Sequence, residues 1–315
     1  MVVTLIKLYN FDLYPDSGIC YGGHSGSKKG ILIAGEKWML KFPKSTKSMD
    51  VSGLTYTTSP ISEYLASHIY ASVGIDTHET ILGKYHDRIV VGCKDFLKST
   101  EEILDFNAIK NNFEPTIEAY IAEKSSHDND QSNDIDAIEM IMQNNHYFLE
   151  NPEFIDLFWD MFIMDAFLAN NDRNENNWGL IINKKTGNLR LTPVYDNGAS
   201  FYDKSPDEKL INILNDEYKF KQMTYDSAIS IFKQNNKDIN PLKFIESRQN
   251  ANCNKALVRI FPKIDMAKIK TIFAELPTYY NDFIVMSDIQ KEVYYKTLEY
   301  KYEKVFKVVY EKLTR

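Results

Sequence analysis

An Asp and an Asn stand five positions apart in one polar loop, and a second Asp follows after two strand-like runs. The loop is Asn170–Trp178, which contains Asp172 and Asn177, and the second carboxylate is Asp196. A helical pattern leads into the loop, and residues 178–195 read as a strand, a tight turn and a return strand. Such a hairpin carries Asp196 back toward the loop, so the sequence predicts that the three polar groups converge.

This spacing of two carboxylates and an amide is typical of a phosphoryl-transfer site of the protein-kinase type. Asp172 suits the group that accepts the proton of the attacking hydroxyl. Asn177 and Asp196 offer the hard oxygen ligands that Mg²⁺ prefers. An Asp and an Asn at this spacing also occur by chance in many chains. The hypothesis therefore needs a cation for the phosphates and a glycine-rich cover elsewhere in the sequence.

A glycine-rich loop near the N-terminus is the candidate cover. Glycines let the backbone approach a ligand closely and point N–H groups at an anion. The loop matches neither a Walker A sequence nor G-x-G-x-x-G, and Ser27 stands where a nucleophile elbow requires Gly. A flexible connection between strands is the alternative interpretation. The candidate nucleotide-binding residues of this loop are Gly22, Gly23, Ser25, Gly26, Ser27 and Lys28.

Lys41 and Glu63 are the candidate cation and its acidic partner. Lys41 lies late in a hairpin expected over residues 31–43, between apolar neighbours. Glu63 lies in the first turns of a helix that is expected to start with Ser59 as N-cap and to end near Gly74. As alternatives, Lys41 is the exposed residue of an alternating strand, and Glu63 is a solvated charge that the helix dipole favours.

The remaining patterns divide the chain into a strand-rich part and a helical part. We expect residues 1–97 to form a β-rich N-lobe with the glycine-rich loop and one helix. We expect residues 98–315 to form a mostly helical C-lobe with the polar loop and the metal-binding hairpin. Further strands are expected over residues 2–9, 79–84 and 88–96, and further helices over 152–169, 266–276 (with Asp265 as N-cap) and 286–312. The end of the last N-lobe strand, Lys94, Asp95 and Phe96, is the expected hinge, whose backbone would bind an adenine.

The helix before the polar loop is expected to be strongly amphipathic, with an aromatic stripe that faces the core. Asp160 and Asp165 on this helix would either brace the following loop or face solvent. His127, in the polar loop 124–134, is expected at the surface. Residues 199–235 carry Ser, Thr and Tyr among charges and are a candidate activation-type segment.

Composition excludes several classes of protein. The net charge of −7 argues against a general nucleic-acid binder, and no direct nucleic-acid contact is expected. Cys20, Cys93 and Cys253 are odd in number and far apart, so neither a disulfide framework nor a thiolate metal site is predicted, and a reducing compartment fits. Without a signal-peptide pattern or an apolar run of about 18 residues, we expect no membrane contact and a cytoplasmic location in the producing cell.

Taken together, these stretches resemble the HipA-like serine/threonine kinases, and the chain is especially similar to the shorter CtkA-type members. The resemblance runs from about residue 20 to 200 and is weaker beyond. It implies a two-lobed α+β kinase fold that uses ATP and Mg²⁺, with catalytic Asp172, metal ligands Asn177 and Asp196, and Lys41 on the phosphates. The matching stretches read GGHSGSK, WMLKFP, SEYLASHIYASVGI, VVGCKDF, FWDMFIMDAFLANNDRNENNWGL and LTPVYDNGAS, with ALVRIFPKIDM further on.

The chain departs from ordinary eukaryotic-type kinases in ways that the HipA-like family shares. Asn170 and Asn171 precede Asp172 where H-R is usual, Asp196-Asn197-Gly198 replaces D-F-G, and no A-P-E follows. The chain is also short for a full-length HipA. The resemblance therefore implies a small partner protein or antitoxin encoded elsewhere, and a protein substrate such as an aminoacyl-tRNA synthetase or a host protein. Export to a host without a cleavable signal is an open alternative to residence in the producing cell.

The resemblance also implies autophosphorylation in the glycine-rich loop, at Ser25 or Ser27. A phosphate there adds about −1.5 to −2 charge, which would repel the phosphates of ATP. The alternative is that these serines only cap the turn. Two other functions stay open beside the active protein kinase: a nucleotide-binding, pseudokinase-like partner in a toxin–antitoxin complex, and a lipid kinase of the phosphoinositide type.

Overall fold

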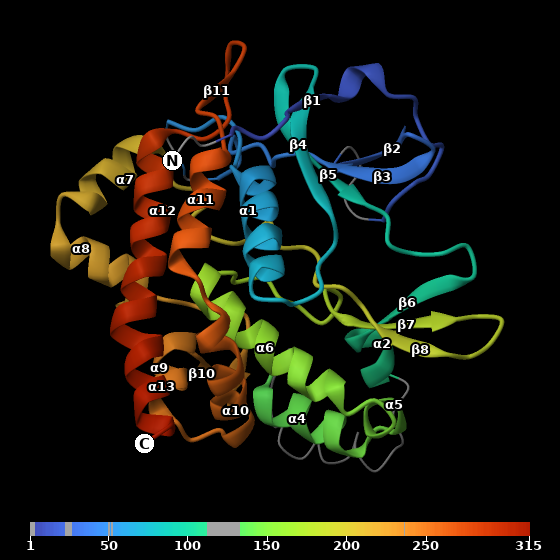
Figure 1. Cartoon of the computed structure of the whole chain (residues 1–315), viewed down its shortest axis with the longest axis vertical. Coiled ribbons are helices and arrows are strands. Elements are labelled where there is room, and N and C mark those ends of the chain that lie inside the picture. Colours follow the sequence, from blue (N-terminus) through green and yellow to red (C-terminus); the bar gives the residue numbers. More distant parts are fainter. Residues whose placement is uncertain (1–3, 23–26, 50, 52, 112–132, 236) are drawn as a thin grey trace.

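The computed structural model of this chain describes residues 4–22, 27–49, 51, 53–111, 133–235 and 237–315. The fold is α+β, with an N-terminal lobe built on a curled β-sheet and a larger helical C-lobe (Figure 1). This architecture confirms the fold class that the sequence predicts.

A five-stranded sheet forms the N-lobe, in the spatial order β1-β4-β5-β3-β2. β1 pairs with β4 in parallel, and the other neighbours are antiparallel. The β2–β3 turn holds Ala34 and Gly35 at φ of 51° and 82°, the left-handed pair that closes a tight hairpin. The strands are β1 (Tyr9–Asn10), β2 (Lys28–Ile33), β3 (Glu36–Lys41), β4 (Thr80–Tyr85) and β5 (Arg88–Lys94).

The first strand is much shorter than the sequence predicts. A strand over residues 2–9 is wrong for residues 4–8, because strand pairing begins only at Tyr9. The backbone N–H of Ile6 donates instead to the carbonyl of Glu275 at the end of a C-lobe helix, at 2.9 Å. The N-terminal segment therefore ties the two lobes together.

Helix α1 (Ser59–Ser72) packs against β4 and β5 on one side and against the C-lobe helix α11 (Met266–Glu275) on the other. Thr58, not Ser59, occupies the N-cap position, and its side chain makes no capping hydrogen bond. The helix ends at the predicted place, with Gly74 at φ 79° just beyond it. Because α1 is buried on both sides, Glu63 is 1% exposed and is not the solvated charge of the alternative interpretation.

A second, three-stranded antiparallel sheet consists of β6 (Glu101–Asp105), β7 (Gly179–Asn183) and β8 (Leu189–Leu191). The sequence predicts the β7–β8 hairpin, but β6 lies where we expected the helices to begin. Beyond β8 the chain leaves the sheet, and Val194 pairs with Thr77 of the N-lobe. The hairpin therefore ends against the N-lobe, immediately before Asp196.

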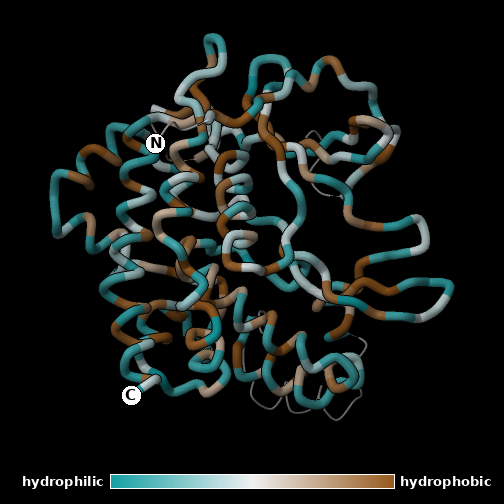
Figure 2. Tube along the Cα trace, in the orientation of Figure 1, coloured by the Kyte–Doolittle hydropathy of each residue, from teal (hydrophilic) through white to brown (hydrophobic). Residues whose placement is uncertain are grey.

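The C-lobe surrounds one central helix, α6 (Glu153–Leu168), whose side chains are buried on nearly all sides. The helices around α6 are α2 (Phe106–Asn111), α4 (Ile135–Asn144), α5 (His146–Leu149), α9 (Pro241–Ser247), α10 (Ala251–Ile260), α11, α12 (Asp288–Lys301) and α13 (Lys307–Leu313). The expected amphipathic helix is therefore wrong in its polar face, because α9, α10 and α12 pack against α6 and Tyr70 of α1 contacts it as well. Figure 2 shows hydrophobic stretches gathered in this region and hydrophilic turns outside it.

Other elements refine the predicted C-lobe. Asp265 caps α11 by accepting the backbone N–H groups of Ala267 and Lys268, as predicted. The predicted long helix over 286–312 is α12 and α13, joined by the π-helical turn η4 (Tyr302–Phe306). Two short hairpins were not predicted from the sequence: β9 (Lys233–Gln234) with β10 (Lys237–Asp238), and β11 (Tyr279–Tyr280) with β12 (Phe283–Ile284). Two 3₁₀ turns are η1 (Phe11–Leu13), which follows β1, and η3 (Phe261–Lys263), which follows α10.

About half of the candidate activation-type segment, residues 199–235, is helical. It contains α7 (Asp207–Leu214), α8 (Glu217–Lys221) and the π-helical turn η2 (Gln222–Asp226), which lie beside α12 (Figure 1). His127 lies outside the described residues. Within the described part of the chain, no helix is long and apolar enough to span a bilayer.

Candidate active site

The polar loop starts where α6 ends, because Ala169 turns left-handed at φ 57° and stops the helix. Within the loop, the Asn170 carboxamide accepts the backbone N–H of Asp172 at 3.2 Å. The Asn177 side chain donates to the carbonyl of Asp172 at 2.9 Å. Both amide side chains thus hold the backbone at Asp172, whose own carboxylate is exposed.

Arg173 organises the underside of the loop and is 1% exposed. Its guanidinium binds Asp165 of α6 through two hydrogen bonds, Nε–Oδ2 at 2.8 Å and Nη2–Oδ1 at 3.1 Å. It also donates to the carbonyl of Tyr195 and to the side chain of Asn197, on either side of Asp196. One buried cation therefore joins the helix, the loop and the segment that follows the hairpin.

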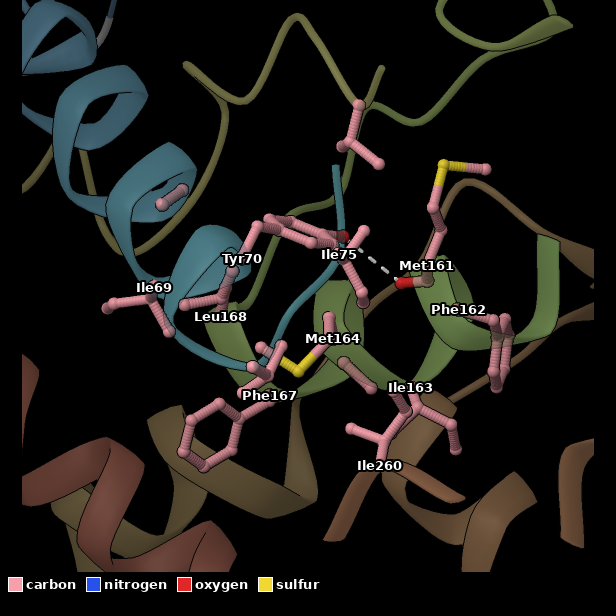
Figure 3. Close-up of a cluster of buried hydrophobic side chains, with 14 of the residues drawn as sticks. Ile69, Tyr70, Ile75, Met161, Phe162, Ile163, Met164, Phe167, Leu168 and Ile260 are labelled. Carbon is pink, nitrogen blue, oxygen red and sulfur yellow. Dashed lines mark hydrogen bonds between the residues drawn. The ribbon is translucent and has the colours of Figure 1, made fainter. Parts of the chain in front are cut away.

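Asp165 is buried and braces the loop, which resolves the two interpretations that its sequence position allowed. It also accepts from the side chain of Asn170 at 2.9 Å. The Tyr70 hydroxyl, from α1, lies 2.6 Å from Asp165 Oδ1 and 3.2 Å from the carbonyl of Met161. Figure 3 shows Tyr70 reaching from α1 to Met161 of α6 within the apolar core. Asp160, by contrast, pairs with Arg259 at the side of α6, at 2.7 Å.

Lys41 lies between two carboxylates that come from different parts of the chain. Its Nζ is 2.9 Å from Glu63 Oε2 and 2.8 Å from Asp196 Oδ1. The Lys41 side chain is only 15% exposed, so the alternative of an exposed strand residue is wrong. Burial alone would lower the pKa of Lys41, but the charges of Asp196 and Glu63 outweigh burial and raise the pKa well above its usual value. The amine is therefore a permanent cation.

Glu63 has two further partners that keep it in place. His78 Nε2 lies 2.9 Å from Glu63 Oε1, and the backbone N–H of Asn197 donates to the same oxygen at 2.9 Å. Burial by itself would raise the pKa of Glu63, but the Lys41 charge and the His78 contact hold that pKa well below its usual range. The carboxylate is thus ionised and fixed between the lobes.

Asp196 takes a strained backbone conformation, with φ 58°. Its side chain is 44% exposed, in contrast to Glu63. The Lys41 charge lowers the pKa of Asp196, so the group is anionic. The contacts of Arg173 to Tyr195 and Asn197 hold the backbone on both sides of this strained residue.

A cavity of about 480 Å³ brings these groups together between the lobes. Lys41, Glu63 and Asp196 line it from one side, and Asp172 lines it from the polar loop. Lys28 lines it from the start of β2, directly across the hairpin from Lys41. The cavity therefore joins the predicted cation, its acidic partner, the candidate base and one candidate metal ligand, whereas Asn177 does not line it.

Part of the predicted glycine-rich cover can be located. Ser27 lines the cavity, and its carbonyl accepts the backbone N–H of Phe42 at 3.0 Å. Gly22 is exposed and does not line this cavity. Gly23, Ser25 and Gly26 lie outside the described residues.

The predicted hinge residues lie at the end of β5, away from this cavity. The backbone N–H groups of Lys94 and Asp95 already donate to the carbonyls of Glu79 and Lys37, each at 2.9 Å. The carbonyl of Phe96 accepts from Arg190 at 3.2 Å. A role of this segment in binding an adenine stays a prediction.

Asn177 and Asp196 have the chemistry of a Mg²⁺ site. No described residue donates to the Asn177 side-chain oxygen, because only its amide nitrogen is used within the loop. A carboxylate oxygen and an amide oxygen are hard donors of the kind that Mg²⁺ selects. Glu63, His78 and Cys93 also bring ligand atoms within 4.8 Å of one another, but Lys41 already neutralises Glu63 there.

Arg173, His78 and Asn197 were not singled out in the sequence. Arg173 follows Asp172 directly, but nothing in the sequence indicates that its partner is Asp165, eight residues earlier and in a helix. His78 stands in a short connection before β4, where a surface position is the ordinary expectation. Asn197 occupies the middle of the Asp-Asn-Gly stretch, where only its departure from the usual Phe was visible.

Two features of this site define the class of protein kinases. A lysine of the N-lobe sheet pairs with a glutamate of a helix, and the helical C-lobe carries a loop with an Asp and an Asn. No protein-family model matches the chain. It is 33% identical to the serine/threonine-protein kinase CtkA of Helicobacter pylori over 300 residues, which is 95% of this chain and 86% of the relative. The chain therefore belongs to the HipA-like serine/threonine kinases of the CtkA type.

The solved structure of one relative agrees with this family. The crystal structure of the Helicobacter pylori proinflammatory kinase CtkA superimposes with a TM-score of 0.84 at 30% identity, covering 98% of this chain and 99% of that one. HipA of Shewanella oneidensis, in a complex with HipB and operator DNA, aligns with a TM-score of 0.49 at 10% identity, over 95% of this chain and 70% of that one. The latter similarity is too low to carry over any binding property.

Proposed function

We propose that this kinase transfers the γ-phosphate of ATP, with Mg²⁺, to a serine or threonine of a protein, at the cavity between the lobes. The observation that carries the proposal is Lys41, held between Glu63 and Asp196 in a cavity that Asp172 also lines. Phosphoryl transfer needs positioning and neutralised charge more than covalent chemistry. A fixed cation beside an exposed carboxylate supplies both.

Each residue has a distinct role in this proposal. The Lys41 ammonium binds phosphate oxygens, and Glu63 keeps it at the cavity wall. The exposed carboxylate of Asp172 orients the attacking hydroxyl and accepts its proton. Asn177 and Asp196 would hold Mg²⁺, which neutralises phosphate charge when bound. Lys28 adds positive charge from the side of the glycine-rich loop, and the segment Lys94–Phe96 would bind the adenine.

Radiolabelled phosphate transfer tests the proposal directly. The protein is incubated with γ-labelled ATP and Mg²⁺, with mixed protein acceptors in one arm and phosphoinositide vesicles in another. We expect label on serine or threonine of proteins, loss of label when Mg²⁺ is chelated, and almost none with Asp172→Asn. Label on lipid alone would point to the phosphoinositide-type alternative. ATP binding without transfer to any acceptor would point to a pseudokinase.

Autophosphorylation in the glycine-rich loop is part of the same proposal. Ser27 lines the cavity, and a phosphate on this loop would bring negative charge to the side where ATP phosphates bind. Intact mass after incubation with Mg-ATP is the measurement. Added phosphate on the wild type that disappears in a Ser25→Ala, Ser27→Ala double variant would support it. Full phosphorylation of that double variant would rule it out.

The biological setting is proposed from the family alone. As a toxin-type or effector kinase, the protein would phosphorylate an aminoacyl-tRNA synthetase or a host protein, and a small partner or antitoxin would bind it. Phosphoproteomes of cells that express the wild type or Asp172→Asn would identify the substrate. Co-purification of the protein from its native host would test for the partner.

A further inference from the structure

Two further cavities adjoin the active-site cavity on its C-lobe side. The active-site cavity shares Lys204 with a larger cavity of about 710 Å³, which we call the lysine groove. The lysine groove shares Met223 and Ser227 with a smaller cavity of about 230 Å³, which we call the Lys301 cavity. Asn171, the residue before Asp172, lines both the active-site cavity and the Lys301 cavity. The active-site cavity and the Lys301 cavity therefore meet at the candidate catalytic loop, and the lysine groove adjoins both of them.

The lysine groove is a basic surface on an acidic protein. The described residues that line it include Lys204, Lys209 and Lys219 and one acidic residue, Glu208, although the chain as a whole carries −7. All three lysines are exposed. Among the described residues, Lys204 and Lys209 form no ion pair, and Lys219 pairs only with Asp216, at 3.4 Å. Lys204 acts electrostatically on Asp203 without forming an ion pair, so the positive charge that the groove offers a ligand comes chiefly from Lys209 and Lys204.

The Lys301 cavity contains buried polar groups whose needs the fold leaves partly unmet. Lys301 is 1% exposed and donates to the carbonyl of Phe167 at 2.9 Å, but within the described chain it has no carboxylate partner. Burial lowers the pKa of Lys301 to about 7. The Thr224 hydroxyl is fully buried beside the Tyr202 side chain, which also lines the cavity. Lys301 uses one of the three hydrogen bonds that its amine can donate, so the amine can still bind a polar group of a ligand.

The walls of these cavities come from irregular backbone. Thr224 lies in the π-helical turn η2, and Lys301 ends α12 where the π-helical turn η4 begins. Turns of the π type cost stability and occur frequently at functional sites. At the rim, Ile229 is 62% exposed, an apolar position open to a partner.

We propose that the lysine groove and the Lys301 cavity bind the segment of the protein substrate that flanks the phosphorylated residue, and that they select acidic side chains there. The inference rests on the proposed protein-kinase function. An extended segment advances about 3.3 Å per residue with side chains on alternating faces. When the acceptor hydroxyl of such a segment lies at Asp172, the segment passes Asn171 and Lys204. The substrate residues next to the acceptor then enter the lysine groove and the Lys301 cavity. Lysines of the groove then meet carboxylates of the substrate.

Nucleic acid fits this surface less well than an acidic peptide does. The described lining of the groove contains three lysines but no arginine or aromatic side chain, and its apolar wall comes from Val51, Pro206, Ile213 and Met223. Binding of single-stranded nucleic acid relies on aromatic stacking as well as on charge. A peptide with alternating acidic and apolar residues matches both the lysines and the apolar wall.

A positional peptide library tests this inference. Each peptide carries one Ser or Thr, with Asp, Ala or Lys placed in turn at the four positions on either side. We expect kcat/KM with Asp to exceed that with Lys by about tenfold or more at several positions on one side of the acceptor. Equal kcat/KM for the Asp and Lys peptides, or a higher value for the Lys peptides, would overturn the proposed acidic selectivity but leave the kinase function intact. Absence of transfer to every peptide and protein, with ATP still bound, would instead defeat the kinase function and this inference with it.

Charge reversal in the groove provides the second measurement. Lys209→Glu with Lys219→Glu should remove the preference for Asp and raise KM for the Asp peptides about tenfold, with the affinity for ATP unchanged. The matched control is Lys255→Glu with Lys268→Glu, two exposed lysines on α10 and α11 that line none of the three cavities. A control as impaired as the groove variant would overturn the proposal.

A third measurement needs no variant. Added salt should raise KM for the Asp peptides and leave KM for the Ala peptides nearly unchanged, because salt screens exposed charges. The same salt dependence for both peptides would contradict a basic groove, even where the groove variant failed to fold. If short single-stranded nucleic acid inhibited phosphorylation of the Asp peptides more strongly than an acidic peptide did, the lysine groove would be a nucleic-acid site and the proposal would be wrong.

Discussion

Arg173 and Asp165 form a buried ion pair directly beneath the loop that carries Asp172, with Nε–Oδ2 at 2.8 Å and exposed side-chain fractions of 1% and 5%. The pair is satisfied on all sides, because Tyr70 and Asn170 also bind Asp165. Burial would lower the pKa of Arg173, but Asp165 outweighs it and raises that pKa further above its usual value. The position of the candidate base thus depends on a charge pair that touches no substrate.

Arg173→Leu should destabilise the fold and disorder the polar loop. Removal of one partner of a buried ion pair leaves the other charged and unpaired, which costs about 3–5 kcal/mol. Urea unfolding gives the loss of free energy. The control is Arg259→Leu, which breaks the more exposed pair with Asp160 (Arg259 is 30% exposed) and should cost about 1 kcal/mol. Equal losses in the two variants would show that the Arg173 pair does not organise the site.

Asp172→Asn should lower kcat by two to four orders of magnitude, about the contribution of a positioned general base. Affinity for ATP should change little, because the side chain is exposed and forms no contact with Lys41, Glu63 or Asp196. Single-turnover transfer and equilibrium ATP binding separate the two quantities. Asp238→Asn, the same substitution at an exposed position on β10 that does not line the active-site cavity, should keep the ordinary transfer rate. Wild-type turnover by Asp172→Asn would remove Asp172 from the mechanism.

Lys41 and Glu63 should be energetically coupled in nucleotide binding. Lys41→Met and Glu63→Gln should each reduce the free energy of ATP binding. The loss in the double variant should be smaller than the sum of the two single losses, with a coupling energy of about 1–3 kcal/mol. Calorimetric titration of all four proteins measures this cycle. The control cycle combines Lys41→Met with Asp12→Asn, because Asp12 pairs with Lys84 and not with Lys41. In this cycle the losses of ATP-binding free energy should be additive. Additivity within the Lys41–Glu63 cycle would mean that the 2.9 Å contact does not position the cation.

Asp203 should make stability depend on pH. Burial raises its pKa from 3.8 to about 6, and the charges of Lys204 and Lys44 offset only part of this. A pKa above the unfolded value favours the protonated form in the folded state. The associated stability is present below about pH 4 and is lost as the pH rises through about 6.

Thermal unfolding between pH 4 and pH 8 measures this effect. Relative to Asp203→Asn, the wild type should lose up to about 3 kcal/mol over that range. Asp238→Asn, an exposed position on β10, should follow the wild type throughout. Parallel profiles for wild type and Asp203→Asn would exclude Asp203 as the source.

The sequence alone predicted the elements that meet at the candidate site. The Asp–Asn spacing, the hairpin before Asp196, the late-strand position of Lys41 and the early-helix position of Glu63 are local patterns, since turn residues and periodicity reveal them within short windows. The two-lobed α+β architecture and the HipA-like family were implied by the resemblance of whole stretches to that family. The short strand β6 and the helices of 199–235 were not predicted, because their conformations depend on pairing with β7 and packing against α12, which are distant in sequence.

Only the tertiary structure decided how the site is held. Glu63 looked equally like a solvated charge until α1 was seen buried between two lobes, and Asp165 was ambiguous until Arg173 was found beside it. The contacts of Arg173, His78 and Asn197 join α6, α1 and the end of the hairpin, segments up to 134 positions apart. Pairings over such separations leave no local pattern in one sequence, because each partner is an ordinary polar residue in its own window. A buried polar network becomes visible only when the fold excludes water and its charges must satisfy one another.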